Sequence, residues 1–193
     1  MIILKNVASI ALILIASSCA TVKLSRDERD ALKVLQRYVQ LDRGGARLDG
    51  TRYHSVAALT SWSEEPGWDS FVVTSGLAIG RPQLSDGKIV ARVRYDVEGI
   101  MEGGTFTPLS GLGSDTASRL AIGEPVAFTL VSTPDGWKIE SPLIAPHVGF
   151  ASARAVAQEL GAENTLHALE DAEYIGKLKG QRAGHCNCER LDF

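Results

Sequence analysis

Apolar and polar side chains alternate with a period of two along residues 88–97, near the middle of the chain. One side of this segment carries Ile89, Ala91, Val93, Tyr95 and Val97, and the other carries Lys88, Val90, Arg92, Arg94 and Asp96. Such alternation is typical of a strand that buries one face. An apolar run over residues 70–79 and the turn signal Asp86-Gly87 precede it, which together predict an antiparallel hairpin.

A second hairpin is predicted over residues 126–139. Its first strand is the apolar run 126–131, and the turn residues Pro134-Asp135-Gly136 lead into Trp137-Lys138-Ile139. Between the two hairpins, residues 98–121 contain five glycines and predict a flexible loop. Within this loop, Thr105-Phe106-Thr107 could form a short edge strand.

Helical periodicity appears at both ends of the apolar region. Ser25 and Glu28 have the spacing of a capping box, and the apolar stripe that follows predicts a helix over 26–43, ended by Gly44-Gly45. A weaker helical pattern covers 51–60, and an Ala-rich helix covers 152–160. A last helix begins near Asn164, with its apolar side chains expected to face inward. These inward side chains are Leu166, Leu169, Ile175 and Leu178.

These elements predict the α+β class, with a long N-terminal helix packed on an antiparallel sheet and with C-terminal helices. One register of helix and sheet buries both apolar faces. The predicted organisation has five parts along the chain. They are a signal peptide (1–18), a tether (19–24), the α+β domain (25–150), C-terminal helices (151–179) and a poorly ordered tail (180–193).

The N-terminal segment has the order of features found in an export signal. Lys5 precedes an apolar run over residues 10–15, which is too short to span a bilayer of ~30 Å. Small residues at 16–18 then lead directly to Cys19. This order resembles the lipobox of bacterial lipoproteins, which implies that Cys19 is lipidated and becomes the mature N-terminus. The alternatives are an ordinary signal peptide and a buried helix with an incidental cysteine.

The resemblance to the lipobox also implies a cellular location. Two or three acyl chains at Cys19 would hold the protein firmly, since each buried CH₂ contributes ~0.8 kcal/mol. Ala20, rather than an aspartate, follows the cysteine, which in a Gram-negative cell favours the periplasmic face of the outer membrane. The formal net charge of −3, without a basic cluster, argues against a nucleic-acid partner.

The order of a capped helix, a short helix and a sheet ending in Gly136-Trp137-Lys138-Ile139 resembles the nuclear-transport-factor-two-like superfamily, which includes ketosteroid isomerases and SnoaL-like cyclases. The strand Arg92-Val93-Arg94-Tyr95-Asp96-Val97 adds to this resemblance, which covers about residues 25–146. It implies a helix across a curved, cone-like sheet with a conical pocket. None of the superfamily's catalytic positions can be matched to a residue of this chain.

Several large side chains with polar tips are candidates to line such a pocket: Tyr38, Tyr53, Trp62, Trp68, Tyr95 and Trp137. Asp69, beside Trp68, could act as a general base if enclosed, and His54 is a second candidate base. The simpler interpretation is that the aromatic residues fill the core, that Asp69 is a turn residue, and that His54 and His147 are structural or solvated.

The tail contains the densest group of soft metal ligands, His185-Cys186-Asn187-Cys188. Such a group could hold copper(I) or zinc, but it lacks the distant second pair that makes a zinc motif specific. Exported cysteines are usually oxidised, which favours a disulfide between Cys186 and Cys188 or a bridge to another chain. No cofactor and no metal site are therefore predicted.

Two functional hypotheses follow from these features. The first is a lipid-anchored, non-enzymatic envelope protein that binds a small apolar ligand or a protein partner, with a homodimer through the outer sheet face as one option. The second is a small isomerase, cyclase or hydratase. Convergence of Asp69, His54 and Tyr95 on one cavity would favour the enzyme, whereas a cavity filled by core side chains would favour the binding protein.

Overall fold

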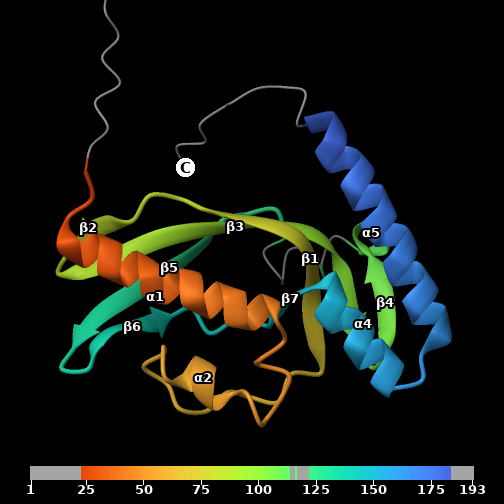
Figure 1. The fold of residues 1–193 in the computed structure, drawn as a ribbon, viewed down its shortest axis with the longest axis horizontal. Coiled ribbons are helices and arrows are strands. Elements are labelled where there is room, and N and C mark those ends of the chain that lie inside the picture. The colour runs from red at the N-terminus through yellow and green to blue at the C-terminus, as the bar shows by residue number, and fades with distance from the viewer. Residues whose placement is uncertain (1–22, 114–115, 117–121, 184–193) are drawn as a thin grey trace, which may run out of the picture.

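The computed structural model describes residues 23–113, 116 and 122–183, and it has the predicted α+β class (Figure 1). Its helices are α1 (Arg26–Arg43), α2 (His54–Ala57), the 3-10 turn η1 (Leu109–Gly111), α4 (Phe150–Glu159) and α5 (Glu163–Ala183). Its strands are β1 (Ser70–Ile79), β2 (Gln83–Ser85), β3 (Lys88–Glu102), β4 (Thr105–Pro108), β5 (Val126–Thr133), β6 (Gly136–Ser141) and β7 (His147–Gly149).

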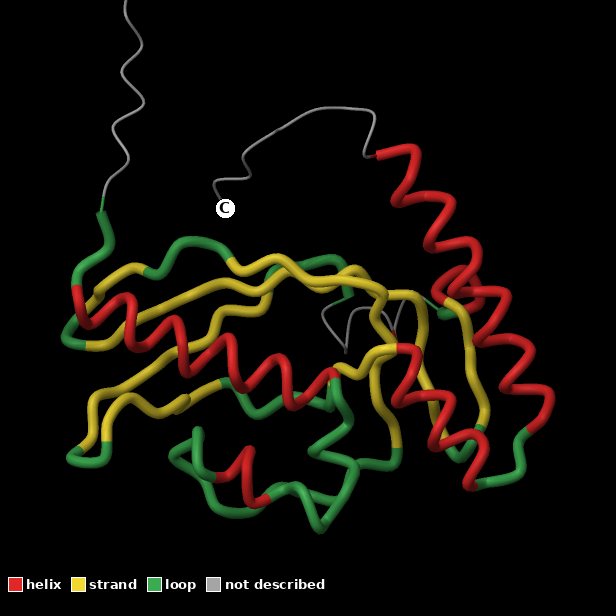
Figure 2. Tube along the Cα trace, in the orientation of Figure 1, coloured by secondary structure: helices red, strands yellow, loops and turns green. Residues whose placement is uncertain are grey.

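One strongly curled sheet forms a half-barrel around α1 (Figure 2). Its strands follow the order β6-β5-β3-β1-β7, and β2 and β4 both pair with β3. All pairs are antiparallel except that β7 runs parallel to β1, with Val72 opposite His147. The prediction of a wholly antiparallel sheet is therefore wrong at this edge, because a three-residue strand carries too little periodicity to be recognised.

The alternation that predicted β3 is confirmed over its first half. Ile89, Ala91, Val93 and Tyr95 are buried, whereas Arg92 and Asp96 are exposed. The two predicted hairpins are also confirmed, since β1 pairs antiparallel with β3 and β5 pairs antiparallel with β6. The short strand β2, which was not predicted, pairs with β3 across the turn Asp86-Gly87.

The predicted loop at 98–121 is wrong over its first part, because β3 continues to Glu102. Gly99 lies inside this strand for a packing reason. A Cβ placed there would lie 2.7 Å from the Phe106 ring, so only glycine lets β4 approach β3 this closely. The edge strand predicted around Thr105-Phe106-Thr107 is confirmed as β4.

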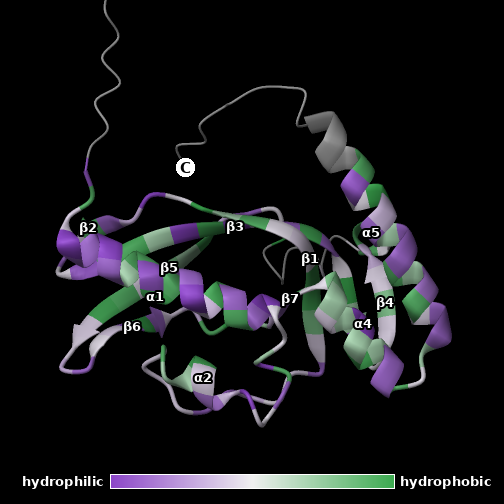
Figure 3. Cartoon of the chain, viewed as in Figure 1, coloured by the Kyte–Doolittle hydropathy of each residue, from purple (hydrophilic) through white to green (hydrophobic). Residues whose placement is uncertain are grey.

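Helix α1 begins with the predicted capping box, in which the Glu28 amide donates to the Ser25 hydroxyl and the Ser25 amide donates to the Glu28 carboxylate. Its apolar face lies against the sheet and its polar face points to solvent (Figure 3). The core that results contains Leu35, Tyr38 and Val39 of α1 together with Ile89, Val93, Phe128, Leu130 and Ile139 of the sheet.

A second core lies beneath α4 and the first half of α5, around Phe71, Met101 and Leu169. Thr165 fixes the start of α5, because its hydroxyl donates to the Gly104 carbonyl at 2.7 Å. The inward orientation predicted for Ile175 and Leu178 is wrong, since they are 49% and 41% exposed. Helix α5 continues to Ala183, into the region predicted as a tail, and the rest of that tail lies outside the described residues.

Gly87 gives a test of the first hairpin. Its φ of 75° lies in the left-handed region, where a Cβ is strained, although no atom within 4 Å would obstruct that Cβ. We expect Gly87→Ala to lower the free energy of unfolding by ~1 kcal/mol in a urea melt. Gly67→Ala is the control, because Gly67 is equally unobstructed and has no positive φ, and its effect should stay within ~0.5 kcal/mol. Equal losses would mean that the turn is not strained.

Candidate functional site

A buried ionic network lies where the loop after α1 meets the loop before β1. The guanidinium of Arg47 is fully buried and donates to both Glu65 oxygens, with Nη2 2.6 Å from Oε2 and Nε 3.1 Å from Oε1. Nη2 also donates to the Ile144 carbonyl at 2.6 Å. Arg47 therefore ties together three segments that are distant in sequence, in the planar geometry that suits a carboxylate.

The Glu65 carboxylate also accepts hydrogen bonds from two tryptophans. The indole of Trp62 donates to Glu65 Oε1 at 3.2 Å, and the indole of Trp68 donates to Glu65 Oε2 at 2.8 Å. The guanidinium carbon of Arg47 lies 5.4 Å from the centre of a Trp68 ring, within the range of a cation–π interaction. Two predicted pocket residues thus serve to hold one buried ion pair.

Asp42, on the last turn of α1, is the second carboxylate of this network. Its Oδ1 lies 3.5 Å from Arg47 Nη1, and its Oδ2 accepts from the His147 amide at 3.0 Å. One cation thus faces two carboxylates. Burial raises the pKa of Asp42 to about 7, although Arg47 and the His147 amide oppose this rise. Burial also lowers the pKa of His147 to about 4, so its imidazole is neutral in the folded protein near neutral pH.

Aromatic side chains fill part of the interior of the curled sheet, among aliphatic ones. Tyr38 packs edge-on against Phe128 with ring centres 5.7 Å apart, and Tyr95 lies 4.2 Å from the His147 ring. The hydroxyls of Tyr38, Tyr53 and Tyr95 are buried without a hydrogen-bond partner among the described residues. Burial raises the pKa of the Tyr38 and Tyr95 hydroxyls above the usual range, so both stay protonated.

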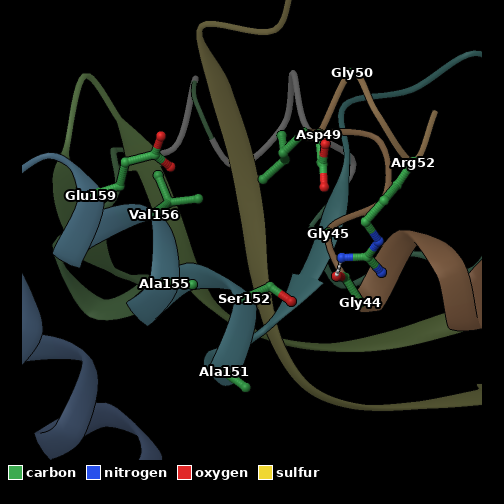
Figure 4. Close-up of a pocket in the computed structure, with 11 residues that line it drawn as sticks. Gly44, Gly45, Asp49, Gly50, Arg52, Ala151, Ser152, Ala155, Val156 and Glu159 are labelled. Carbon is green, nitrogen blue, oxygen red and sulfur yellow. Dashed lines mark hydrogen bonds between the residues drawn. The ribbon is translucent and has the colours of Figure 1, made fainter.

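An open groove lies beside this network, between the loop that follows α1 and helix α4 (Figure 4). Its volume is about 740 Å³. Its lining consists of Gly44, Gly45, Leu48, Asp49, Gly50, Arg52, Ala151, Ser152, Ala155, Val156 and Glu159. Two smaller pockets, of about 310 and 280 Å³, share Leu48 with it, and we call the three together the Leu48 groove.

The lining of the Leu48 groove combines small residues with a charged rim. Gly44 and Gly50 expose backbone on the loop wall, and the α4 wall carries the exposed alanines Ala151 and Ala155. Asp49, Arg52 and Glu159 supply the charges. Arg52 Nη1 donates to the Gly44 carbonyl at 3.0 Å, which fixes its side chain across the end of α1. The walls are joined by Ser152, whose hydroxyl donates to the Arg43 carbonyl at 3.0 Å. Such a surface suits an extended chain with polar groups better than a purely apolar molecule.

The candidate acid–base residues do not come together. His54 is exposed and contacts only its own turn, with Nδ1 2.9 Å from the Thr51 carbonyl oxygen. Asp69 is exposed at the smallest pocket of the Leu48 groove, and Tyr95 is buried against His147. No hydrogen bond within the described part of the chain joins any two of these three residues.

Of the predicted pocket residues, Tyr53, Trp62 and Trp68 do gather at one place, around Glu65 and Arg47. Tyr53 and Trp68 also line the 310 Å³ pocket with these two charged residues. Sequence reasoning missed Asp42, Arg47 and Glu65 as a group. One feature of the sequence could have indicated this group: Trp62 and Trp68 each lie three positions from Glu65.

The predicted lipidation site and the tail cysteines lie outside the described residues. The predicted lipidation site is Cys19, and the tail cysteines are Cys186 and Cys188. Within residues 23–113, 116 and 122–183, no helix is long and apolar enough to cross a membrane. The same residues contain no group of three or more His, Cys, Asp or Glu side chains that could hold a metal ion.

Comparison with known proteins gives no relative: no family model, curated protein or solved structure matches this chain. The resemblance to the nuclear-transport-factor-two-like superfamily stays a prediction.

Proposed function

We propose that this protein is a lipid-anchored, non-enzymatic envelope protein that binds a partner protein in the Leu48 groove. The observation that carries the proposal is the groove itself, with a main cavity of about 740 Å³ beside a rigid buried network. A small apolar ligand, the other binding option, would need an enclosed apolar lining. The exposed backbone and the charged rim of this groove favour an extended polypeptide segment.

The buried network supports this function by holding one wall of the groove in place. Arg47 joins the loop that carries Leu48 and Asp49 to Glu65 and to the Ile144 carbonyl. A loop fixed in this way loses little conformational freedom when a partner binds, and a pre-organised surface gains affinity for that reason.

The enzymatic alternative has one supporting feature, the raised pKa of Asp42, which lies near the value that suits a general base. However, Asp42 is only 1% exposed and does not line the Leu48 groove. Its oxygens face Arg47 and the His147 amide, so no substrate atom can reach them without opening the core. A binding function accounts for this arrangement better.

The anchor at Cys19 and the cone-like fold are parts of the same proposal. The N-terminal order of charge, apolar run and small residues before Cys19 supports the anchor and a place at the periplasmic face of the outer membrane. The position of α1 inside a curled sheet supports a cone-like arrangement, with its interior filled by Tyr38 and Phe128.

Native mass spectrometry of the full chain, extracted from its own membrane, tests both parts. We expect acyl chains on Cys19 and a bound second polypeptide of different mass. Ala155→Trp should remove the partner, because residue 155 is exposed on the groove wall and an indole there would fill the groove. Gln158→Trp is the matched control, since this exposed residue of α4 lies outside the lining, and it should keep the partner.

The outcomes separate the parts of the proposal. A bound small molecule without a polypeptide would reject the protein partner, and so would equal loss of the partner in both variants. A chain without acyl mass, or unchanged membrane attachment in Cys19→Ser, would reject the anchor.

A further inference from the structure

The smallest pocket of the Leu48 groove, of about 280 Å³, combines an apolar floor with an acidic rim. Its floor consists of side chains that are buried or half-buried: Leu48, Trp68, Phe71 and Met101. Its rim carries three exposed carboxylates, those of Asp69, Glu102 and Glu159. We call this pocket, with its floor and its three carboxylates, the acidic pocket.

The three carboxylates come from elements that are distant in sequence. Asp69 directly precedes β1 and Glu102 ends β3, and the two meet at one end of the sheet because Ser70 lies opposite Glu102. Glu159 is the last residue of α4, and Figure 4 shows it on the α4 side of the groove, across from Asp49. The fold therefore gathers negative charges that no local motif connects.

No cation of the described chain balances these charges. Among the described residues, none of the three carboxylates makes an ion pair or a side-chain hydrogen bond, and the described lining of the pocket contains no Lys or Arg. The nearby Arg47 is already paired with Glu65, and Arg52 is held by the Gly44 carbonyl. Like charges that share one site repel one another, so a cation that enters the pocket is attracted by all three.

The lining of the acidic pocket favours a long basic side chain as this cation. Its floor is apolar, which suits the methylene stem of Lys or Arg, and the Trp68 indole offers a ring that attracts an ammonium or guanidinium group. The volume lies just below the ~300–1,000 Å³ of small-molecule pockets, as expected for a site that takes one side chain. Within the described residues, these three carboxylates included, no group could hold a metal ion.

We infer that the acidic pocket binds one Lys or Arg side chain of the partner polypeptide. The inference rests on the proposed function, the binding of an extended segment in the Leu48 groove. The pocket shares Leu48, Val156 and Glu159 with the main cavity, so a side chain of a segment that lies in that cavity can enter it. Its charged head then lies among the carboxylates, and its stem covers Leu160, which is 59% exposed at the rim. The partner is thus a polypeptide with a basic residue at this position.

Fluorescence anisotropy of labelled hexa-arginine tests the contact on the full chain, after a high-salt wash has released bound polypeptides. Glu102→Gln combined with Glu159→Gln should raise the Kd of the peptide roughly tenfold, because two ion pairs at a solvated rim are lost. Glu124→Gln combined with Asp135→Asn is the matched control. It removes the same charge from exposed positions outside the groove lining, and its Kd should stay within about twofold of the native value.

The outcomes keep this inference apart from the proposed function. An equal rise in Kd for both double variants would show that the peptide responds only to net charge, and would overturn the acidic pocket, as would a Kd that neither variant changes. In native mass spectrometry, a partner that is retained by the Glu102→Gln, Glu159→Gln chain but lost from Ala155→Trp would keep the protein partner and reject the acidic pocket. Selective peptide binding by a chain that carries no native partner would support the pocket and reject the proposed function.

Discussion

Arg47→Met is expected to lower the free energy of unfolding by ~3–5 kcal/mol, because it leaves the buried Glu65 carboxylate without its cation. The Arg47 side chain is fully buried, and Glu65 is 6% exposed. Methionine fills part of the space but supplies none of the donors that now reach Glu65 and the Ile144 carbonyl. A urea melt followed by tryptophan fluorescence would also report the network directly, since the indoles of Trp62 and Trp68 bond to Glu65.

Lys88→Met is the matched control for this prediction. Lys88 pairs with Glu140 at 2.6 Å, the same distance as Arg47 with Glu65, but both partners of that pair are at least 40% exposed. Its loss should cost less than ~1 kcal/mol, since water solvates the remaining carboxylate. Arg47→Lys keeps the charge but not the planar fork, and we expect an intermediate loss. Equal small losses for Arg47→Met and Lys88→Met would show that the buried network does not stabilise the fold.

The sequence predicted the sheet well where side chains alternate. Residues 88–95 bury every second side chain because one face of β3 lies on α1, and the turn residues Asp86-Gly87 have the positive φ values that their types favour. The prediction of elements and of burial was wrong where the same residue type fits two structural roles. Gly99 indicates a loop by composition, yet here it allows close packing of β4. Ile175 and Leu178 have core spacing, but α5 extends past the surface that it covers.

The candidate site was harder to predict, because its parts come from segments that sequence spacing does not connect. Asp42 looks like a polar residue near a helix end, and Glu65 looks like part of a solvated turn. The pairing of β7 with β1 brings the first residue of β7 against the last turn of α1, where the His147 amide donates to Asp42. The aromatic candidates Trp62 and Trp68 were recognised by size, but their role in fixing Glu65 depends on tertiary contacts.

The pH dependence of stability is the second large effect that we expect, and it begins with Asp42. Its pKa is about 7 in the folded protein and ~3.9 in an unfolded chain. Between these values the folded state binds more protons, so this group contributes stability below about pH 4 that is lost as the pH rises through 7. The difference of roughly three pH units corresponds to about 4 kcal/mol.

His147 acts in the opposite direction over almost the same range. Its pKa is about 4 when folded, below the ~6.5 of an unfolded histidine, so the unfolded state binds more protons between these values. This group contributes stability above about pH 6.5 that is lost as the pH falls toward 4, by about 3 kcal/mol in all. The two contributions largely cancel in the native protein, because the pKa values of Asp42 and His147 shift in opposite directions over the same pH range.

Urea melts of two variants between about pH 4 and 7.5 would separate these contributions. Relative to the native curve, the stability of Asp42→Asn should rise by about 3 kcal/mol from pH 4 to 6.5, because Asp42 no longer offsets the His147 contribution. Relative to the native curve, the stability of His147→Gln should fall as the pH rises toward 7, because His147 no longer offsets the Asp42 contribution. Loss of the Tyr95 contact also lowers the whole curve. Curves parallel to that of the native protein would mean that neither group titrates inside the folded core. Opposite slopes, by contrast, would show that Asp42 and His147 both titrate inside the folded core, with opposite effects on stability.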